Sequence, residues 1–278
     1  MTPSRSFLHR LVGGLSPRLI KRISALQFHN PVFRAAIEAG SRFLRHRDLV
    51  IRHGVGAGLR FNTGEGNVGY VLGTTEQPMQ QAIAEHLRPG GVFYDIGAHV
   101  GFFTVLGARL VGEQGRVYTF EPLPANVAAL RHNLALNAFP HVELFDAAVS
   151  ETAGESGLQL VGNSTGPKLL EAGVREDSRG TITVRTVALD ALLAAGQIQP
   201  ATVMKVDVEG AEIEVMRGAR QLLTQHRPVV ICEMHGRNAE YVALMAELGY
   251  QVRTLDGDPD VVNAYWNVHT LALPTEGR

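Results

Sequence analysis

A glycine turn after an apolar segment is the first feature of this sequence that could support chemistry. Residues 92–96 read Val-Phe-Tyr-Asp-Ile, and Gly97 and Gly101 follow with three residues between them. The apolar run predicts a buried strand with Asp95 at its end and a helix that opens near Gly101. Gly97 permits a tight turn against a ligand, and Gly101 permits close helix–strand packing. Ligands of open α/β sheets bind outside the carboxyl ends of the strands, where this turn is expected.

The spacing of this turn separates two kinds of ligand. It reads Gly-x-x-x-Gly, not the Gly-x-Gly-x-x-Gly of a dinucleotide fold. A carboxylate at Asp95 repels a pyrophosphate but suits the cationic amino-acid end of S-adenosylmethionine (SAM). Ala98 and His99 complete the cofactor contacts expected in the turn. The alternative is an ordinary glycine turn in a fold without a nucleotide.

Two further acidic residues lie at the ends of predicted strands. Glu121 lies twenty-four residues after Gly97, and an acid at that place accepts hydrogen bonds from ribose hydroxyls. Asp146 lies at the end of the third strand and is expected to accept a hydrogen bond from the exocyclic amine of adenine. The alternatives are a solvated carboxylate for Glu121 and a turn-capping residue for Asp146.

A lysine and two acids alternate at the end of a later strand. In an extended strand Lys205, Asp207 and Glu209 share one face, which points to the same crevice as Asp95. Ionisable groups on a central strand are costly to bury unless they are paired or used, so we expect either structural pairing or catalysis.

The next strand adds a histidine and a carboxylate. Glu233 and His235 are expected to meet Asp207 across the crevice, where His235 could accept a hydroxyl proton or be merely structural. Asp207 and Glu233 alternatively suit Mg²⁺, which prefers oxygen ligands. The single cysteine, Cys232, should point away from Glu233 into the core.

The elements that position these residues alternate regularly. We expect helices at 77–87, 101–111, 124–137, 191–195, 211–225 and 238–248, and strands at 92–96, 116–121, 142–148, 181–187, 202–207, 228–233, 251–255 and 268–273. Asp190 is a good N-cap for the helix at 191–195. The alternation predicts an α/β fold with a mostly parallel sheet and helices on both faces.

Three segments are expected along the chain. They are a helical basic N-terminal extension (1–48), a small cap of short strands followed by a mobile loop (49–75) and the main domain (76–278). The extension has a net charge of +7, against −8 for the remainder. This charge suits contact with an anionic membrane or an acidic partner, or a solvated helical extension.

Composition sets further limits. The overall charge of −1 argues against a nucleic-acid partner, and a single cysteine excludes an intramolecular disulfide. The sequence shows neither a membrane span nor a signal peptide, so a cytoplasmic location is expected. Oligomeric state and the acceptor are not indicated.

Taken together in this order, the motifs resemble the FkbM family of SAM-dependent methyltransferases. The resemblance runs from about residue 58 to 256 and rests on segments 94–104, 120–122, 205–212 and 231–235. It implies a Rossmann-like class I methyltransferase fold with a seven-stranded sheet. It also implies SAM as cofactor and O-methylation of a hydroxyl on a sugar, polyketide or other small metabolite. The family usually has Asn where this chain has His99.

The reaction expected is direct transfer of the SAM methyl group to oxygen. His235 or Asp207 would take the proton, and Lys205 would steady the developing alkoxide. The rival functions are a nicotinamide-dependent oxidoreductase, a catalytically inactive SAM-fold partner protein and a nucleic-acid methyltransferase. A missing third glycine disfavours the first, and the intact acidic and lysine positions disfavour the second.

Overall fold

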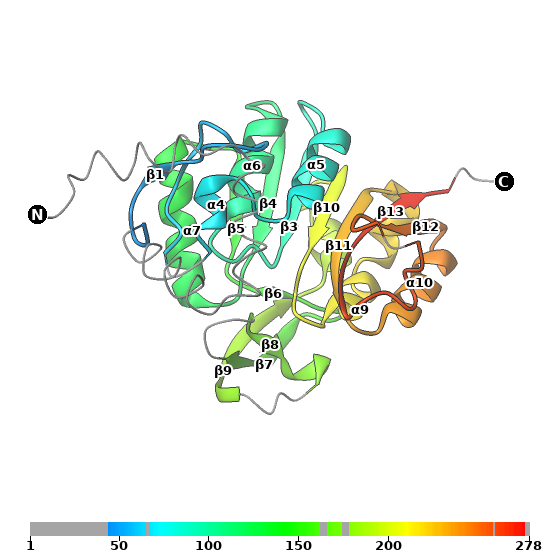
Figure 1. The fold of residues 1–278 in the computed structure, drawn as a ribbon. Coiled ribbons are helices and arrows are strands. Elements are labelled where there is room, and N and C mark those ends of the chain that lie inside the picture. Colours follow the sequence, from blue (N-terminus) through cyan, green and yellow to red (C-terminus); the bar gives the residue numbers. More distant parts are fainter. Residues whose placement is uncertain (1–43, 65–66, 162–165, 174–177, 258, 276–278) are drawn as a thin grey trace, which may run out of the picture. The chain divides into compact units, whose positions relative to one another are not determined.

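The chain is described by a computed structural model that covers residues 44–64, 67–161, 166–173, 178–257 and 259–275 (Figure 1). Contacts divide it into two compact units, residues 1–77 and 78–278. Nearly all of the expected basic extension, residues 1–43, lies outside the described residues, so its helices stay a prediction. Among the described residues, no helix is long and apolar enough to cross a membrane.

The first unit contains a short antiparallel pair, β1 (Leu49–Val50) and β2 (Arg60–Phe61), as expected. The loop predicted after the pair is instead partly helical, with α4 at Gly69–Leu72. The reason is apolar packing, because the buried Phe61 ring meets the Tyr70 ring edge-on at 5.8 Å between centroids.

The second unit is built on a seven-stranded sheet in the order β12-β13-β11-β10-β3-β4-β5. Its strands are β3 (Val92–Ile96), β4 (Arg116–Phe120), β5 (Val142–Phe145), β10 (Val203–Val206), β11 (Val229–His235), β12 (Tyr250–Thr254) and β13 (Asn267–Pro274). The five strands from β5 to β11 are parallel, and β13 is antiparallel to both of its neighbours. The mostly parallel sheet predicted from the sequence is therefore confirmed.

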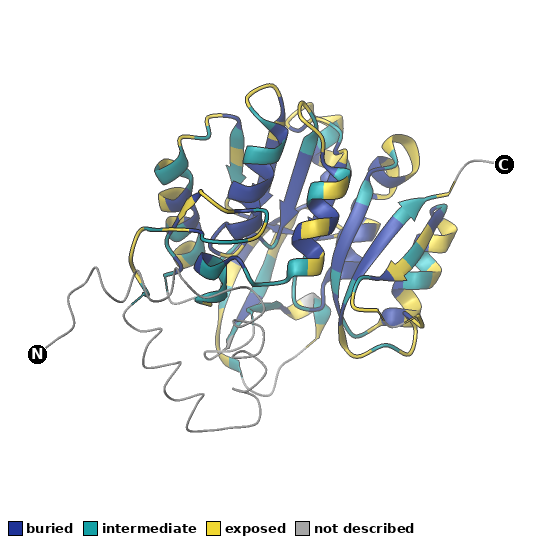
Figure 2. Ribbon diagram, turned by 45° about the horizontal axis from the view of Figure 1, so that its top comes forward, coloured by how far each residue is buried: buried dark blue, intermediate teal, exposed yellow. Residues whose placement is uncertain are grey.

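Helices cover both faces of this sheet, whose central strands are buried (Figure 2). They are α5 (Gln77–His86), α6 (Phe102–Val111), α7 (Pro124–Asn137), α8 (Leu189–Ala194), α9 (Glu212–Arg217) and α10 (Asn238–Glu247). On one face, Gly107 of α6 lies so close to the Phe93 ring that a Cβ would approach it to 2.3 Å. On the other, Tyr94 shares a core cluster with Ile213 of α9 and Tyr241 of α10. Neighbouring strand residues point to opposite faces, which explains this division.

A second, four-stranded sheet follows β5, and its strand β9 (Ser178–Val187) contains the strand expected at 181–187. Its order is β6-β9-β7-β8, with β6 at Ala148–Val149, β7 at Gly154–Val161 and β8 at Lys168–Leu169. The prediction of one strand over residues 142–148 is therefore wrong after Phe145, where β5 ends. The chain leaves the main sheet after Phe145, and Ala148 pairs with Thr186 of β9.

The helix predicted at 211–225 is also interrupted. α9 ends at Arg217, and a π-helical turn at Leu222–His226 follows. At Gly218 a Cβ would lie 2.2 Å from the Ser150 carbonyl oxygen, so another chain segment crosses at the break. Asp190 does not cap its own helix; its carboxylate accepts from the backbone N–H groups of Gln221 and Leu222 at 2.8 and 2.9 Å.

Candidate active site

The glycine turn at the carboxyl end of β3 packs directly on the end of β10. Gly97 has φ +74°, and a Cβ there would lie 1.8 Å from the carbonyl oxygen of Asp207. No other residue fits this approach. The N–H groups of Gly97 and Ala98 both donate to the Phe120 carbonyl at 3.0 Å. The turn is thus fixed between β4 and β10.

Gly101 ends the turn for a different reason from the one expected. It has φ +87°, and a Cβ would lie 2.8 Å from Cγ of Leu130 in α7. The close contact is therefore between helices α6 and α7, not between helix and strand.

Asp95 and Lys205 form the buried centre of this region. The Asp95 side chain is fully buried; Thr104 donates to its Oδ2 at 2.6 Å, and Lys205 Nζ lies 3.3 Å from its Oδ1. Lys205 also donates to the Gly97 carbonyl at 2.8 Å and lies 3.7 Å from Asp207 Oδ2. The Lys205 side chain is only 3% exposed. The ammonium therefore compensates two carboxylates and holds the turn.

Glu121 lies beside the same turn, just after β4. Its two carboxylate oxygens accept from His99 N at 2.8 Å, Leu123 N at 2.9 Å and Asn126 Nδ2 at 3.1 Å. Burial raises the pKa of Glu121 to about 7, and the three donors only partly oppose this shift. Its protonation thus changes near neutral pH.

His99 occupies the left-handed region with φ +52°. Asn, Asp and His are enriched there among non-glycine residues, so this backbone conformation tolerates His99. Burial and the nearby charge of Lys205 lower the pKa of its imidazole, so the ring is neutral at neutral pH.

The structure brings Asp207, Glu233 and His235 together. One ligand atom from each lies within 4.8 Å of the others. Glu209 is not on the strand face expected from the sequence. It follows the end of β10 with φ +55°, and its carboxylate reaches His235 Nε2 at 3.5 Å. His235 Nδ1 lies 2.9 Å from Glu212 Oε1.

His235 is held in its charged form. Burial lowers the pKa of His235, but the hydrogen bond to Glu212 and the charges of Asp207 and Glu209 outweigh burial and raise it to about 9. An imidazolium has no lone pair to accept a proton.

His269 also contacts this cluster, although no motif of the sequence points to it. It faces Glu233 in the antiparallel β11–β13 register, with Nε2 at 3.4 Å from Glu233 Oε2, and Nδ1 pairs with Asp256 at 3.1 Å. Burial raises the pKa of Glu233, but pairing with His269 and His235 outweighs burial and holds it below its ordinary value. Cys232 is fully buried, as expected.

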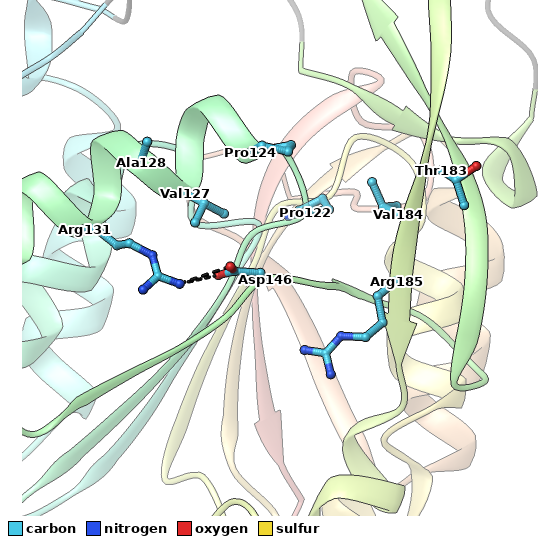
Figure 3. A pocket seen from close by; sticks show the side chains of 9 residues that line it. All are labelled: Pro122, Pro124, Val127, Ala128, Arg131, Asp146, Thr183, Val184 and Arg185. Carbon is cyan, nitrogen blue, oxygen red and sulfur yellow. Dashed lines mark hydrogen bonds and ion pairs between the residues drawn. The ribbon is translucent and has the colours of Figure 1, made fainter.

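Asp146 lines a pocket of about 340 Å³, together with Pro122, the residue that follows Glu121 in the chain. The pocket lies between α7 and β9, and its lining residues are Pro122, Pro124, Val127, Ala128, Arg131, Asp146, Thr183, Val184 and Arg185 (Figure 3). Arg131 donates to both carboxylate oxygens of Asp146 at 3.1 Å. The lining combines apolar side chains with the charged groups of Arg131, Asp146 and Arg185.

The strands of the main sheet have the order and direction of the Rossmann-like class I methyltransferase fold. A glycine turn follows β3 and the acidic residue Glu121 follows β4. The chain belongs to the methyltransferase FkbM domain family, whose model matches residues 95–252.

Two curated relatives are similar over most of their length. Hexuronic acid methyltransferase AglP of Haloferax volcanii is 26% identical over 191 residues, which cover 67% of this chain and 75% of the relative. The 31-O-demethyl-FK506 methyltransferase FkbM of Streptomyces tacrolimicus is 26% identical over 220 residues, which cover 67% and 81%. A solved methyltransferase FkbM from Methylobacillus flagellatus aligns with a TM-score of 0.46 at 17% identity. That alignment covers 74% of this chain and about half (55%) of the solved protein.

Proposed function

We propose that this methyltransferase transfers the methyl group of SAM to a hydroxyl oxygen of a small metabolite. The observation that carries the proposal is the position of Asp207. Its backbone packs against the Gly97 turn, and its carboxylate belongs to the cluster with Glu233 and His235. A methyl donor seated on the turn therefore lies next to groups that orient a hydroxyl and take its proton.

The cofactor residues divide between contact and support. We propose that the turn at Gly97, Ala98, His99 and Gly101 receives the amino-acid end of SAM and that Glu121 receives the ribose. Asp95 supports the turn through Lys205, because its carboxylate is fully buried and already paired. The pocket beside Pro122 suits adenine, with Asp146 at its edge.

In the proposed reaction the acceptor oxygen attacks the methyl carbon of SAM. The carbon–sulfur bond breaks with both electrons passing to sulfur, and the hydroxyl proton passes to Asp207. The geometry favours Asp207 over His235 as this base, because its side chain is 27% exposed and that of His235 only 7%. Lys205 is too deeply buried and too fully paired to meet an alkoxide, so we assign it to positioning.

The relatives agree with this reaction. By their names, one methylates a hexuronic acid and the other a 31-O-demethyl compound. The test is to incubate the protein with SAM and a panel of hydroxylated acceptors and to measure S-adenosylhomocysteine and the methyl ether. Formation of both at equal rates supports the proposal. SAM binding without turnover on any acceptor favours the inactive partner protein, and turnover on RNA alone favours nucleic-acid methylation.

We expect full activity in excess chelator. The cluster of Asp207, Glu233 and His235 supplies two oxygen ligands and one nitrogen ligand, whereas Mg²⁺ prefers oxygen. His235 and His269 already pair with Glu233, and Lys205 lies 3.7 Å from Asp207, so a cation is not required to compensate the two carboxylates. The measurement compares initial rates before and after chelation, with added Mg²⁺ and Mn²⁺ as controls. Loss of activity that either metal restores would assign these residues to a metal site.

SAM affinity should rise with pH near neutrality. A carboxylate accepts two ribose hydroxyls, whereas a protonated Glu121 cannot, and its pKa in the free protein is about 7. Because Glu121 must lose its proton before it accepts both hydroxyls, binding should be about tenfold weaker one pH unit below this pKa than well above it. Calorimetric titration across this range measures the effect.

The control variants for this titration are Glu121→Gln and Glu113→Gln. An amide does not ionise, so Glu121→Gln should bind weakly with no pH dependence between pH 6 and 8, about one unit on either side of the Glu121 pKa. Glu113 is exposed, and Glu113→Gln should show the same pH dependence of SAM binding as the unchanged protein. If SAM binding by Glu121→Gln still depended on pH, Glu121 would not be the residue that binds the ribose.

A further inference from the structure

Two neighbouring aromatic side chains stand exposed just before β13. Tyr265 is 73% exposed and Trp266 is 49% exposed, and they are adjacent in the chain. Single exposed apolar residues are common on protein surfaces, but an adjacent pair of large aromatic rings marks a candidate contact surface. We call Tyr265 and Trp266 the aromatic pair.

The aromatic pair is fixed to the end of β11, where the candidate active site begins. Gly236 N donates to the Trp266 carbonyl at 2.6 Å. The buried Asn238 side chain donates to the carbonyls of Ala264 and Tyr265 at 3.3 and 3.5 Å. Backbone held in this way presents the two rings at a defined place.

The Trp266 ring lies next to His235, a member of the cluster of Asp207, Glu233 and His235. Its centroid lies 5.7 Å from that of the His235 ring, at an angle of 56°. His235 in turn contacts carboxylate oxygens of Glu209 at 3.5 Å and of Glu233 at 3.7 Å. An aromatic ring and hydrogen-bond acceptors are therefore neighbours around His235.

This combination selects among hydroxylated acceptors. An aromatic ring packs against an apolar C–H face, and carboxylates accept hydrogen bonds from hydroxyls. A pyranose ring offers a C–H face and a rim of hydroxyls at once. A wholly aliphatic acceptor would offer Glu209 and Glu233 no hydroxyl donors. An anionic acceptor would approach a group in which the four carboxylates of Asp207, Glu209, Glu212 and Glu233 outnumber the imidazolium groups of His235 and His269.

We infer that the aromatic pair is the stacking platform for the sugar ring of an uncharged glycoside acceptor, with Glu209 and Glu233 accepting hydrogen bonds from its hydroxyls. The inference rests on the proposed O-methylation and names its substrate class. The platform holds the ring while one hydroxyl faces Asp207.

The chain offers a direct probe, because Trp266 is its only tryptophan. Intrinsic fluorescence therefore reports on this residue alone. We would titrate the full chain with methyl glycosides of glucose, galactose, mannose and rhamnose, and with methyl glucuronide and an aliphatic diol. A saturable change in emission is expected with at least one neutral glycoside, and a smaller change or none with the glucuronide and the diol.

Substitutions locate the binding. Tyr265→Ala should weaken glycoside binding about tenfold, the loss of one aromatic stacking contact. Trp266→Ala, followed by calorimetry, should weaken it at least as much, and Trp266→Phe should retain most of it. Val262→Ser is the matched control, since Val262 is exposed in the same loop and should bind as the unchanged protein does.

The outcomes separate this inference from the proposed function. Unaltered SAM binding without a fluorescence response to any neutral glycoside, or with an equal response to the diol, would overturn the platform and leave methyl transfer intact. A concentration-dependent self-association that Trp266→Ala abolishes, without a glycoside response, would assign the surface to a second copy of the chain. A glycoside response in a protein that binds no SAM would support the platform and contradict the methyltransferase proposal.

Discussion

Replacing Asp207 with asparagine is expected to lower kcat by roughly 10²–10⁴-fold, the usual contribution of a positioned general base. The amide has nearly the same shape but cannot take the hydroxyl proton. Binding of SAM should change little, because Glu121 and the turn at Gly97 are retained. Single-turnover rates and calorimetric titration with SAM measure the two quantities separately.

The nature of the acceptor distinguishes a lost base from a lost contact. An acidic phenol needs less help to lose its proton than an alcohol does, so Asp207→Asn should impair methylation of a phenol less. Glu143→Gln, at an exposed position of β5, is the control and should leave both rates unchanged. If Asp207→Asn lowered the methylation rate equally on both acceptors, Asp207 would be a positioning residue. If kcat stayed near that of the unchanged protein, Asp207 would have no part in the reaction.

The second large effect is expected at Lys205. Its ammonium is the charge partner of Asp95, at 3.3 Å, and lies 3.7 Å from Asp207. Lys205→Met keeps the aliphatic length but leaves the fully buried Asp95 carboxylate without its partner. Breaking a buried pair in this way costs roughly 3–5 kcal/mol of unfolding free energy. Chemical denaturation followed by circular dichroism measures the loss.

Two comparisons test the cause of this loss. The double variant Lys205→Met/Asp95→Asn should recover a large part of the stability, because it removes the unpaired charge. Lys168→Met, in the half-buried strand β8, should be nearly neutral. A single variant as stable as the unchanged protein would show that Lys205 does not compensate Asp95.

Much of the main domain follows from the sequence because its signals are local. Mostly apolar segments such as residues 92–96 and 203–206 predict buried strands, and a helix follows each of these two strands. In a parallel sheet this alternation places the carboxyl ends of the strands at the same edge of the sheet. Asp95, Glu121 and Lys205 were therefore identifiable as neighbours before their distances were known.

Where elements break was decided by tertiary contacts. The sequence around Asp146 continues an apolar strand pattern, yet the chain turns there because Ala148 pairs with Thr186, far along the sequence. Likewise, α9 ends where Ser150 crosses Gly218, and Asp190 caps a turn that starts thirty-one residues later. The periodicity of residues within one segment does not indicate which distant segments will contact it.

The sequence by itself determined the fold class, the glycine turn and the set of acidic residues at the strand ends, since these depend on residue type and short spacing. Only the tertiary structure decided how their charges are paired. The β11–β13 register brings His269 to Glu233, and the loop before β13 brings Trp266 to His235. Antiparallel register between distant strands is set by packing of the whole sheet, so these neighbours emerge only in the folded chain.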